Sequence, residues 1–157
     1  MLKRFSVILI LILAFCGLAD SAYLTQHVES GTPLICNIQS LSGCNVVADS
    51  QYSRVFGIPL AAVGLFFYVL VFIAAALEWL LVNRALRRLL QALAIIGLLF
   101  SLYSTVLQVF FIHAYCIYCL ASAVITLFMF VCATLIEPMR SKVAPTVLPT
   151  LLMPPHA

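Results

Sequence analysis

Residues 89–136, LLQALAIIGLLFSLYSTVLQVFFIHAYCIYCLASAVITLFMFVCATLI, contain no Asp, Glu, Lys or Arg. As one α-helix this run would measure roughly 70 Å, because a helix rises about 1.5 Å per residue. The hydrocarbon core of a bilayer is only about 30 Å thick. We therefore expect two membrane spans, at 89–112 and 117–136, separated by the most polar point of the run, His-Ala-Tyr-Cys at residues 113–116.

Two further apolar runs lie earlier in the chain, at residues 5–24 and 55–81. The first is interrupted only by Asp20, and the second carries no charge before Glu78. Long continuous runs favour helices over a β-barrel, whose strands would alternate over about ten residues. The sequence therefore predicts an all-α integral membrane protein, a bundle of four transmembrane helices.

The composition agrees with a membrane protein. Of the 157 residues, 65% are hydrophobic and 8% are charged, whereas a soluble domain is roughly 45–50% apolar and about 25% charged. A small soluble domain could not cover so much apolar surface, and a disordered chain would be polar. Both classes are excluded, and nothing in the sequence indicates a nucleic-acid partner.

The basic residues set the expected orientation. All but Arg54 fall on one predicted side of the membrane: Lys3, Arg4, Arg84, Arg87, Arg88, Arg140 and Lys142. The positive-inside rule places that side, with both termini, in the cytoplasm. The loop at 25–54 and the turn at 113–116 are then extracytoplasmic. Residues 1–137 form the predicted membrane domain, and the proline-rich residues 138–157 are expected to be a disordered cytoplasmic tail.

The N-terminus permits a second interpretation. Its basic start, its apolar run and Ala19-Asp20-Ser21 resemble a cleaved signal peptide over residues 1–22. A lipoprotein cleavage site before Cys16 is disfavoured by the bulky Phe15. Cleavage would leave the orientation of everything downstream unchanged.

The predicted topology divides the six cysteines into two kinds. Cys16 and Cys132 lie inside spans, where cysteine acts as a small apolar residue. The other four fall on the extracytoplasmic side, where disulfides form and persist: Cys36, Cys44, Cys116 and Cys119.

The two extracytoplasmic pairs differ physically. Cys116-Ile-Tyr-Cys119 begins a helix, where free N–H groups and the helix dipole stabilise a thiolate, although burial opposes ionisation. Cys36 and Cys44 lie in a loop with Ser42-Gly43 between them, and such a loop can move. A mobile pair near a fixed pair permits a relay, because a thiolate attacks a neighbouring disulfide.

Two other interpretations of these four cysteines stay open at this point. Both pairs could be structural disulfides in a membrane scaffold without enzymatic activity. Zinc is disfavoured, because the ligand spacings are unusual and no acidic or histidine residue supports them. We predict no metal site.

Several further features, combined with the cysteines, resemble the bacterial form of the vitamin K epoxide reductase family. Ser50 follows the loop pair by the family's spacing, Tyr52 and Phe-Gly-Ile-Pro-Leu at 56–60 open the second span, and Cys-x-x-Cys opens the last one. The similarity covers about residues 5–136. The disulfide bond protein B family has these motifs in the reverse order.

The resemblance implies a four-helix bundle around a quinone, ubiquinone or menaquinone, in a bacterial inner membrane. Cys119 would exchange electrons with the quinone and Cys116 with the loop. Cys44 would attack Cys116, Cys36 would meet the external thiol protein, and Ser50 would order the active-site region. The external protein is expected to be a separate periplasmic thioredoxin-like protein, similar to disulfide bond protein A, because the chain carries no fused domain of that kind.

Other polar residues of the third span are candidates for quinone contact. Ser101, Thr105 and Gln108 fall on one face of an α-helix, where they would bond to a quinone carbonyl or to a neighbouring helix. His113 precedes Cys116 by three residues and would carry a proton or anchor the helix end at the interface.

Two departures from the family pattern bear on the substrate. Ala123 stands where vertebrate members have a tyrosine, and the span at 55–81 has no asparagine. Reduction of an epoxide is therefore not implied. The sequence predicts a thiol-disulfide oxidoreductase that passes electrons from the thioredoxin-like protein through both pairs to the quinone.

Overall fold

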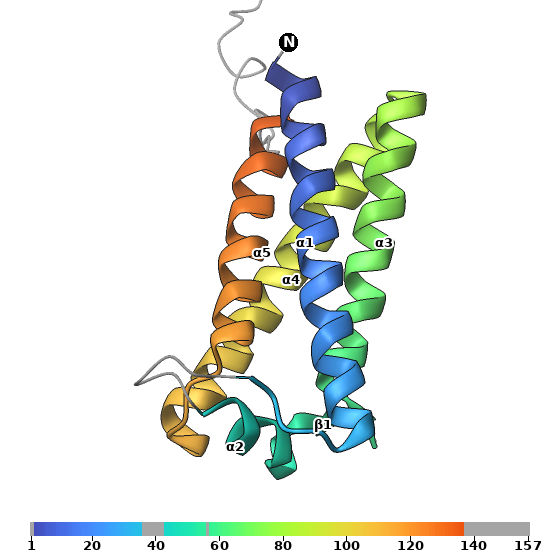
Figure 1. The fold of residues 1–157 in the computed structure, drawn as a ribbon. Helices are drawn as coiled ribbons and strands as arrows, with labels where there is room; N and C mark the ends of the chain where they lie inside the picture. The colour runs from blue at the N-terminus through green and yellow to red at the C-terminus, as the bar shows by residue number, and fades with distance from the viewer. Residues whose placement is uncertain (1, 36–42, 56, 137–157) are drawn as a thin grey trace, which may run out of the picture.

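The computed structural model describes residues 2–35, 43–55 and 57–136. Within these residues it has four long helices, which lie side by side (Figure 1). They are α1 (Leu2–Ser30), α3 (Leu60–Leu81), α4 (Arg84–Val106) and α5 (Ile117–Ile136). Each is long and apolar enough to cross a membrane, which confirms the prediction of an all-α membrane bundle. Cys36 and the tail expected at 138–157 lie outside the described residues.

Several helix boundaries differ from those expected: α1 starts at Leu2 instead of 5, and α4 starts at Arg84 instead of 89. α1 continues to Ser30, beyond the expected end at 24, because no glycine or proline lies between that residue and Gly31, whose φ is +67°. The second span was expected from 55, but α3 begins at Leu60. Its preceding residues form a two-stranded antiparallel hairpin of β1 (Arg54–Val55) and β2 (Ile58–Pro59), which turns at Gly57 with φ +82°.

Shorter elements gather at the end of the bundle opposite the N-terminus (Figure 1). The loop after α1 contains α2 (Cys44–Asp49) and the 3₁₀ turn η2 (Gln51–Ser53). α4 continues directly into the π-helix η3 (Leu107–Ile112). His113, in the left-handed conformation with φ 52°, ends η3 before α5 starts.

At the other end of the bundle, Glu78 closes the turn between α3 and α4. Its carboxylate is only 3% exposed and accepts hydrogen bonds from Arg87 Nε at 2.6 Å and from Asn83 N at 2.9 Å. Asn83 in turn caps α4, since its Oδ1 accepts from Ala85 N. A buried charge is stable only when it is paired and hydrogen-bonded, and Glu78 meets both conditions.

The bundle core depends on close packing of α1 against α3 and α5. Tyr68 of α3 is fully buried, and its hydroxyl lies 2.7 Å from Ser122 Oγ on α5. Gly17 of α1 packs directly on the Tyr68 ring. Large apolar side chains such as Phe66 and Phe110 instead face outward, as expected of a surface that contacts lipid.

The substitution Gly17→Val should destabilise the protein by about 1–3 kcal/mol, because a Cβ at this position would overlap the Tyr68 ring. Unfolding of the purified protein, followed by circular dichroism in detergent, measures the change. Cys16→Val is the matched control, since Cys16 is exposed on the same helix. Equal stability of the two variants would contradict the packing described here.

Candidate functional site

A cavity of about 130 Å³ lies where the helices meet the short elements of the loop. Its walls come from α1, α2, η2, α3, α4, η3 and α5, and they are mostly apolar. Three cysteines line it: Cys44, Cys116 and Cys119. The cavity therefore joins the loop cysteine to the C-x-x-C pair, which the sequence only suggested were on the same side of the membrane.

Cys116 is fixed at the start of α5. It is 1% exposed, and its backbone N–H donates a 3.0 Å hydrogen bond to Gln108 Oε1 of η3. Its carbonyl accepts from Leu120 N, which begins the helical ladder. Cys119 follows in the first turn, and both cysteines are free thiols. The π-helix thus supplies the side chain that positions the reactive pair.

The thiol of Cys116 ionises more readily than an ordinary cysteine. The side-chain hydrogen bond with Cys119 is the largest cause, and it lowers the pKa of Cys116 to about 7. Burial acts in the opposite direction, while the backbone N–H groups of Cys119 and Tyr118 add to the lowering. The balance between helix start and burial, which the sequence left open, therefore favours a thiolate near neutral pH.

The loop cysteine lies against this pair. Cys44 is 1% exposed, is disulfide-bonded, and belongs to one buried cluster with Leu34 and Cys116. A Cβ on Gly43 would lie 2.8 Å from Ala114 Cβ and 2.9 Å from Tyr115 N. Only glycine permits this approach, so Gly43 allows the loop to contact the turn before α5. From the sequence, this glycine was expected to make the loop mobile.

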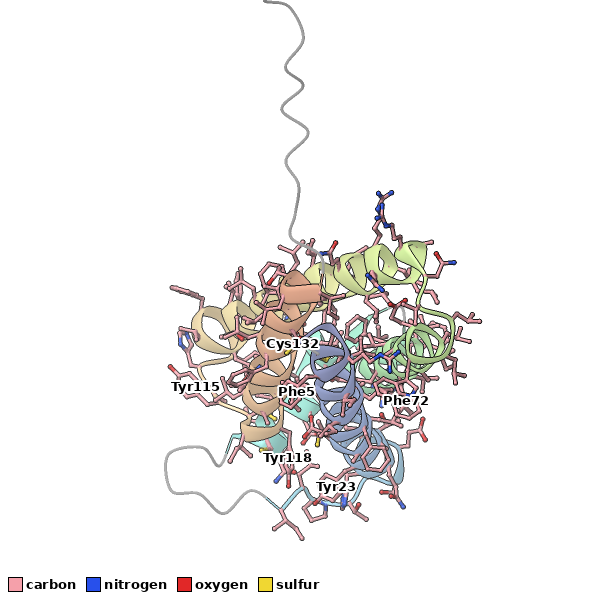
Figure 2. The ribbon with its side chains drawn as sticks, turned by 90° about the horizontal axis from the view of Figure 1, so that it is seen from above. Phe5, Tyr23, Phe72, Tyr115, Tyr118 and Cys132 are labelled. Carbon is pink, nitrogen blue, oxygen red and sulfur yellow. The ribbon has the colours of Figure 1, made fainter. Side chains whose placement is uncertain are left out.

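Both described flanks of the loop are anchored. Leu34 N donates to Asn45 Oδ1 at 2.8 Å, which ties the chain after α1 to α2. Tyr118 Oη donates to Ile35 O at 3.0 Å, and its ring contacts Tyr23 of α1 at 5.2 Å between centroids. Figure 2 shows these two tyrosines close together, while Tyr115 lies at the edge of the bundle. The loop is thus held over the start of α5.

Ser50 ends α2 and lines the cavity. Its Oγ donates to Val47 O at 2.7 Å, and its backbone N–H also donates to that carbonyl. Its contacts are therefore within the loop.

The remaining candidates from the sequence separate into two groups. Ser101 and Gln108 line the cavity, whereas Thr105 and His113 do not. Thr105 Oγ1 donates to Ser101 O in its own helix, and His113 is exposed. Thr105 therefore uses its hydroxyl within α4 and takes no part in the cavity wall.

Ser101 has a structural partner as well. Its Oγ lies 2.9 Å from Thr126 Oγ1 of α5, so it joins two helices. Gln108 is 3% exposed, and only its oxygen is used by Cys116, which leaves its amide N–H groups as donors. Among the described residues, no group of three or more His, Cys, Asp or Glu side chains is arranged to hold a metal ion.

Asp20 was not chosen from the sequence as a site residue. It lines the cavity from α1, and its Oδ2 is buried with no hydrogen-bond partner in the described part of the chain. The signal in the sequence is its position as the one charge that interrupts an apolar run, although the sequence does not show that it lies near the cysteines.

The sequence model of the Vitamin K epoxide reductase family matches residues 8–134, most of the chain. That segment contains every residue lining the cavity, and also Cys36. No curated protein matches the chain.

The rate at which Cys116 is alkylated in the reduced protein should rise with pH, with a midpoint near 7. Only the thiolate reacts, and the pKa of Cys116 is about 7. Below the midpoint the rate should fall about tenfold per pH unit. Loss of the hydrogen bond in Cys119→Ala should move the midpoint toward about 8.5, the ordinary cysteine value. Iodoacetamide trapping and peptide mass spectrometry measure both, with Cys16 and Cys132 replaced by alanine. An unchanged midpoint in Cys119→Ala would contradict the assigned cause.

Proposed function

Because the chain belongs to the vitamin K epoxide reductase family, we propose that it oxidises a separate thioredoxin-like protein and passes the electrons to a membrane quinone. The family makes the chain a membrane thiol-disulfide oxidoreductase, and its members in general use quinones as electron partners. One observation carries the proposal: a disulfide-bonded Cys44 and the free thiols of Cys116 and Cys119 line one apolar cavity.

The relay proceeds by thiol-disulfide exchange. A thiolate of the thioredoxin-like protein attacks Cys36 of a Cys36–Cys44 disulfide, and its second thiol completes its own disulfide. The freed Cys44 thiolate then attacks Cys116 of a Cys116–Cys119 disulfide, and Cys119 leaves as a thiolate. Finally Cys36 attacks Cys44, which restores the loop disulfide and leaves Cys116 and Cys119 reduced.

The described redox states are consistent with this order. Cys44 is oxidised while Cys116 and Cys119 are thiols, the distribution expected just before the quinone accepts two electrons and two protons. Burial of Cys44 and Cys116 in one cluster supports direct exchange between them.

The cavity suits the ring of a quinone, the second substrate of the reaction. An apolar cavity of about 150 Å³ binds benzene in an engineered protein, and this one is about 130 Å³. Cys119 lines it, as the electron donor must, and Gln108 offers amide N–H donors for a carbonyl oxygen. We assign Gln108 to quinone binding, with Ser101 as a wall residue.

The distribution of charge supports an orientation. Arg4, Arg84, Arg87 and Arg88 lie at the end of the bundle that holds the N-terminus, whereas Arg54 lies at the cavity end. By the positive-inside rule, the arginine-rich end faces the cytoplasm. We propose a bacterial inner membrane with both termini cytoplasmic and the cysteines on the periplasmic side.

Cys119→Ala should reduce quinone reduction to background, because the sulfur that completes the Cys116 disulfide is removed. The assay mixes purified protein, ubiquinone or menaquinone analogue, and a reduced thioredoxin-like protein, and follows quinone absorbance. Cys132→Ala is the control, since Cys132 is buried in the core and does not line the cavity. Full activity of Cys119→Ala, or none in the unmodified protein, would contradict the proposed function.

Cys36→Ser should accumulate a Cys44–Cys116 disulfide, because the thiol that resolves it is missing. Acid quenching, alkylation and peptide mass spectrometry identify the linkage, and Cys16→Ser should accumulate none. A trapped Cys44–Cys119 linkage would reverse the order within the C-x-x-C pair. Turnover at the normal rate in Cys116→Ser would exclude the relay altogether.

A further inference from the structure

Asp20 is a carboxyl group within a membrane helix, at the wall of the cavity that holds the thiols. Its Oδ2 is buried and has no hydrogen-bond partner among the described residues. Ionisable groups at such depth are costly and face a bundle interior or a cavity. A contribution to the stability of the fold therefore does not explain why a carboxyl group stands at position 20.

Glu78 is a structural carboxylate, and a comparison with it shows how Asp20 differs. Glu78 is buried and binds Arg87 and the backbone of Asn83, whereas Asp20 is partly buried and its buried Oδ2 has no such partner in the described part of the chain. Of the residues that the structure describes, no Lys, Arg or His lines the Asp20 cavity. The titratable groups on which Asp20 acts electrostatically are Tyr68 of α3, the α5 residues Tyr118 and Cys119, and Cys116 just before them.

The proposed reaction requires a proton carrier at this place. When the dithiol becomes a disulfide, it releases two electrons and two protons, and the quinone takes up both of each to become a quinol. The cavity is mostly apolar, so free exchange with bulk water is restricted. The Tyr68 hydroxyl is engaged with Ser122, whereas a carboxyl in a site of low dielectric readily holds a proton.

We propose that Asp20 is the proton-transfer residue of quinone reduction, a role that rests on the function proposed above. The carboxylic acid gives its proton to a quinone oxygen as the electrons leave the thiols. The carboxylate then accepts a proton released from the Cys116–Cys119 dithiol as the disulfide forms. One dithiol proton thus reaches the quinol through Asp20, the other reaches the second oxygen, and Asp20 returns to its starting state.

The test uses Asp20→Asn in the full chain, with Asp20→Glu as the variant that keeps a carboxyl group. Glu29→Gln is the control, since Glu29 is an exposed acid on the same helix and does not line the cavity. Pre-reduced protein is mixed with a quinone analogue in a stopped-flow instrument across pH. Exchange between the loop pair and Cys116–Cys119 is measured separately by quenching without quinone.

Asp20→Asn should slow quinol formation by about 100-fold, within the usual range for a lost general acid or base. The fall in rate at alkaline pH, caused by loss of the carboxyl proton, should disappear. Thiol exchange and the thermal midpoint should both stay close to normal, because an amide of the same size replaces a protonated carboxyl group. Asp20→Glu should retain a pH-dependent rate between the two.

Three outcomes would overturn the inference. A normal quinol rate in Asp20→Asn would exclude proton transfer by this residue. Equal slowing of quinol formation and thiol exchange, together with a lower thermal midpoint, would assign Asp20 a structural role. Absence of quinone reduction in the unmodified protein would overturn the proposed function itself, and this inference with it.

Discussion

A polar group inside a bilayer finds no water, so it needs a partner within the protein, and this constraint arranges the whole bundle. Ser101 meets Thr126, Tyr68 meets Ser122, and Glu78 meets Arg87. These pairs join neighbouring helices, and each consumes the hydrogen-bonding capacity of the side chains involved. The groups left for the proposed chemistry are few: the thiols at the start of α5, and Asp20 within α1.

The same constraint explains how the thiols are held. The first backbone N–H groups of a helix have no partner within that helix. Gln108 satisfies one of them at Cys116, and the Cys116 sulfur draws on N–H groups further along the first turn. The Gln108 side chain, which bonds to the backbone at the start of α5, therefore also fixes the residue that carries the reactive sulfur. The start of this helix thus serves both the structure and the chemistry.

The sequence predicted the features that depend on local composition, but it did not predict those that depend on contacts between distant segments of the chain. Four apolar runs and one polar break sufficed for four helices, because span length and hydropathy are local properties. The π-helix at Leu107, the approach of Gly43 to residues 114–115 and the place of Asp20 are different. Each involves segments that are distant in the chain, so the hydrophobic periodicity of the sequence does not predict it. Gly43 illustrates the difference. From the sequence alone this glycine indicates a mobile loop, whereas in the structure it allows the loop to approach residues 114–115.

Burial of the exchanging sulfurs has a consequence for selectivity. Cys44 and Cys116 are each 1% exposed, so a small thiol dissolved in the surrounding fluid has no direct access to them. Direct reduction of these two sulfurs by dissolved thiols is therefore disfavoured relative to reduction through Cys36, the loop cysteine at which the proposed relay begins. Burial at the start of α5 thus favours a protein donor that engages the loop over small thiols that would reduce Cys44 or Cys116 directly.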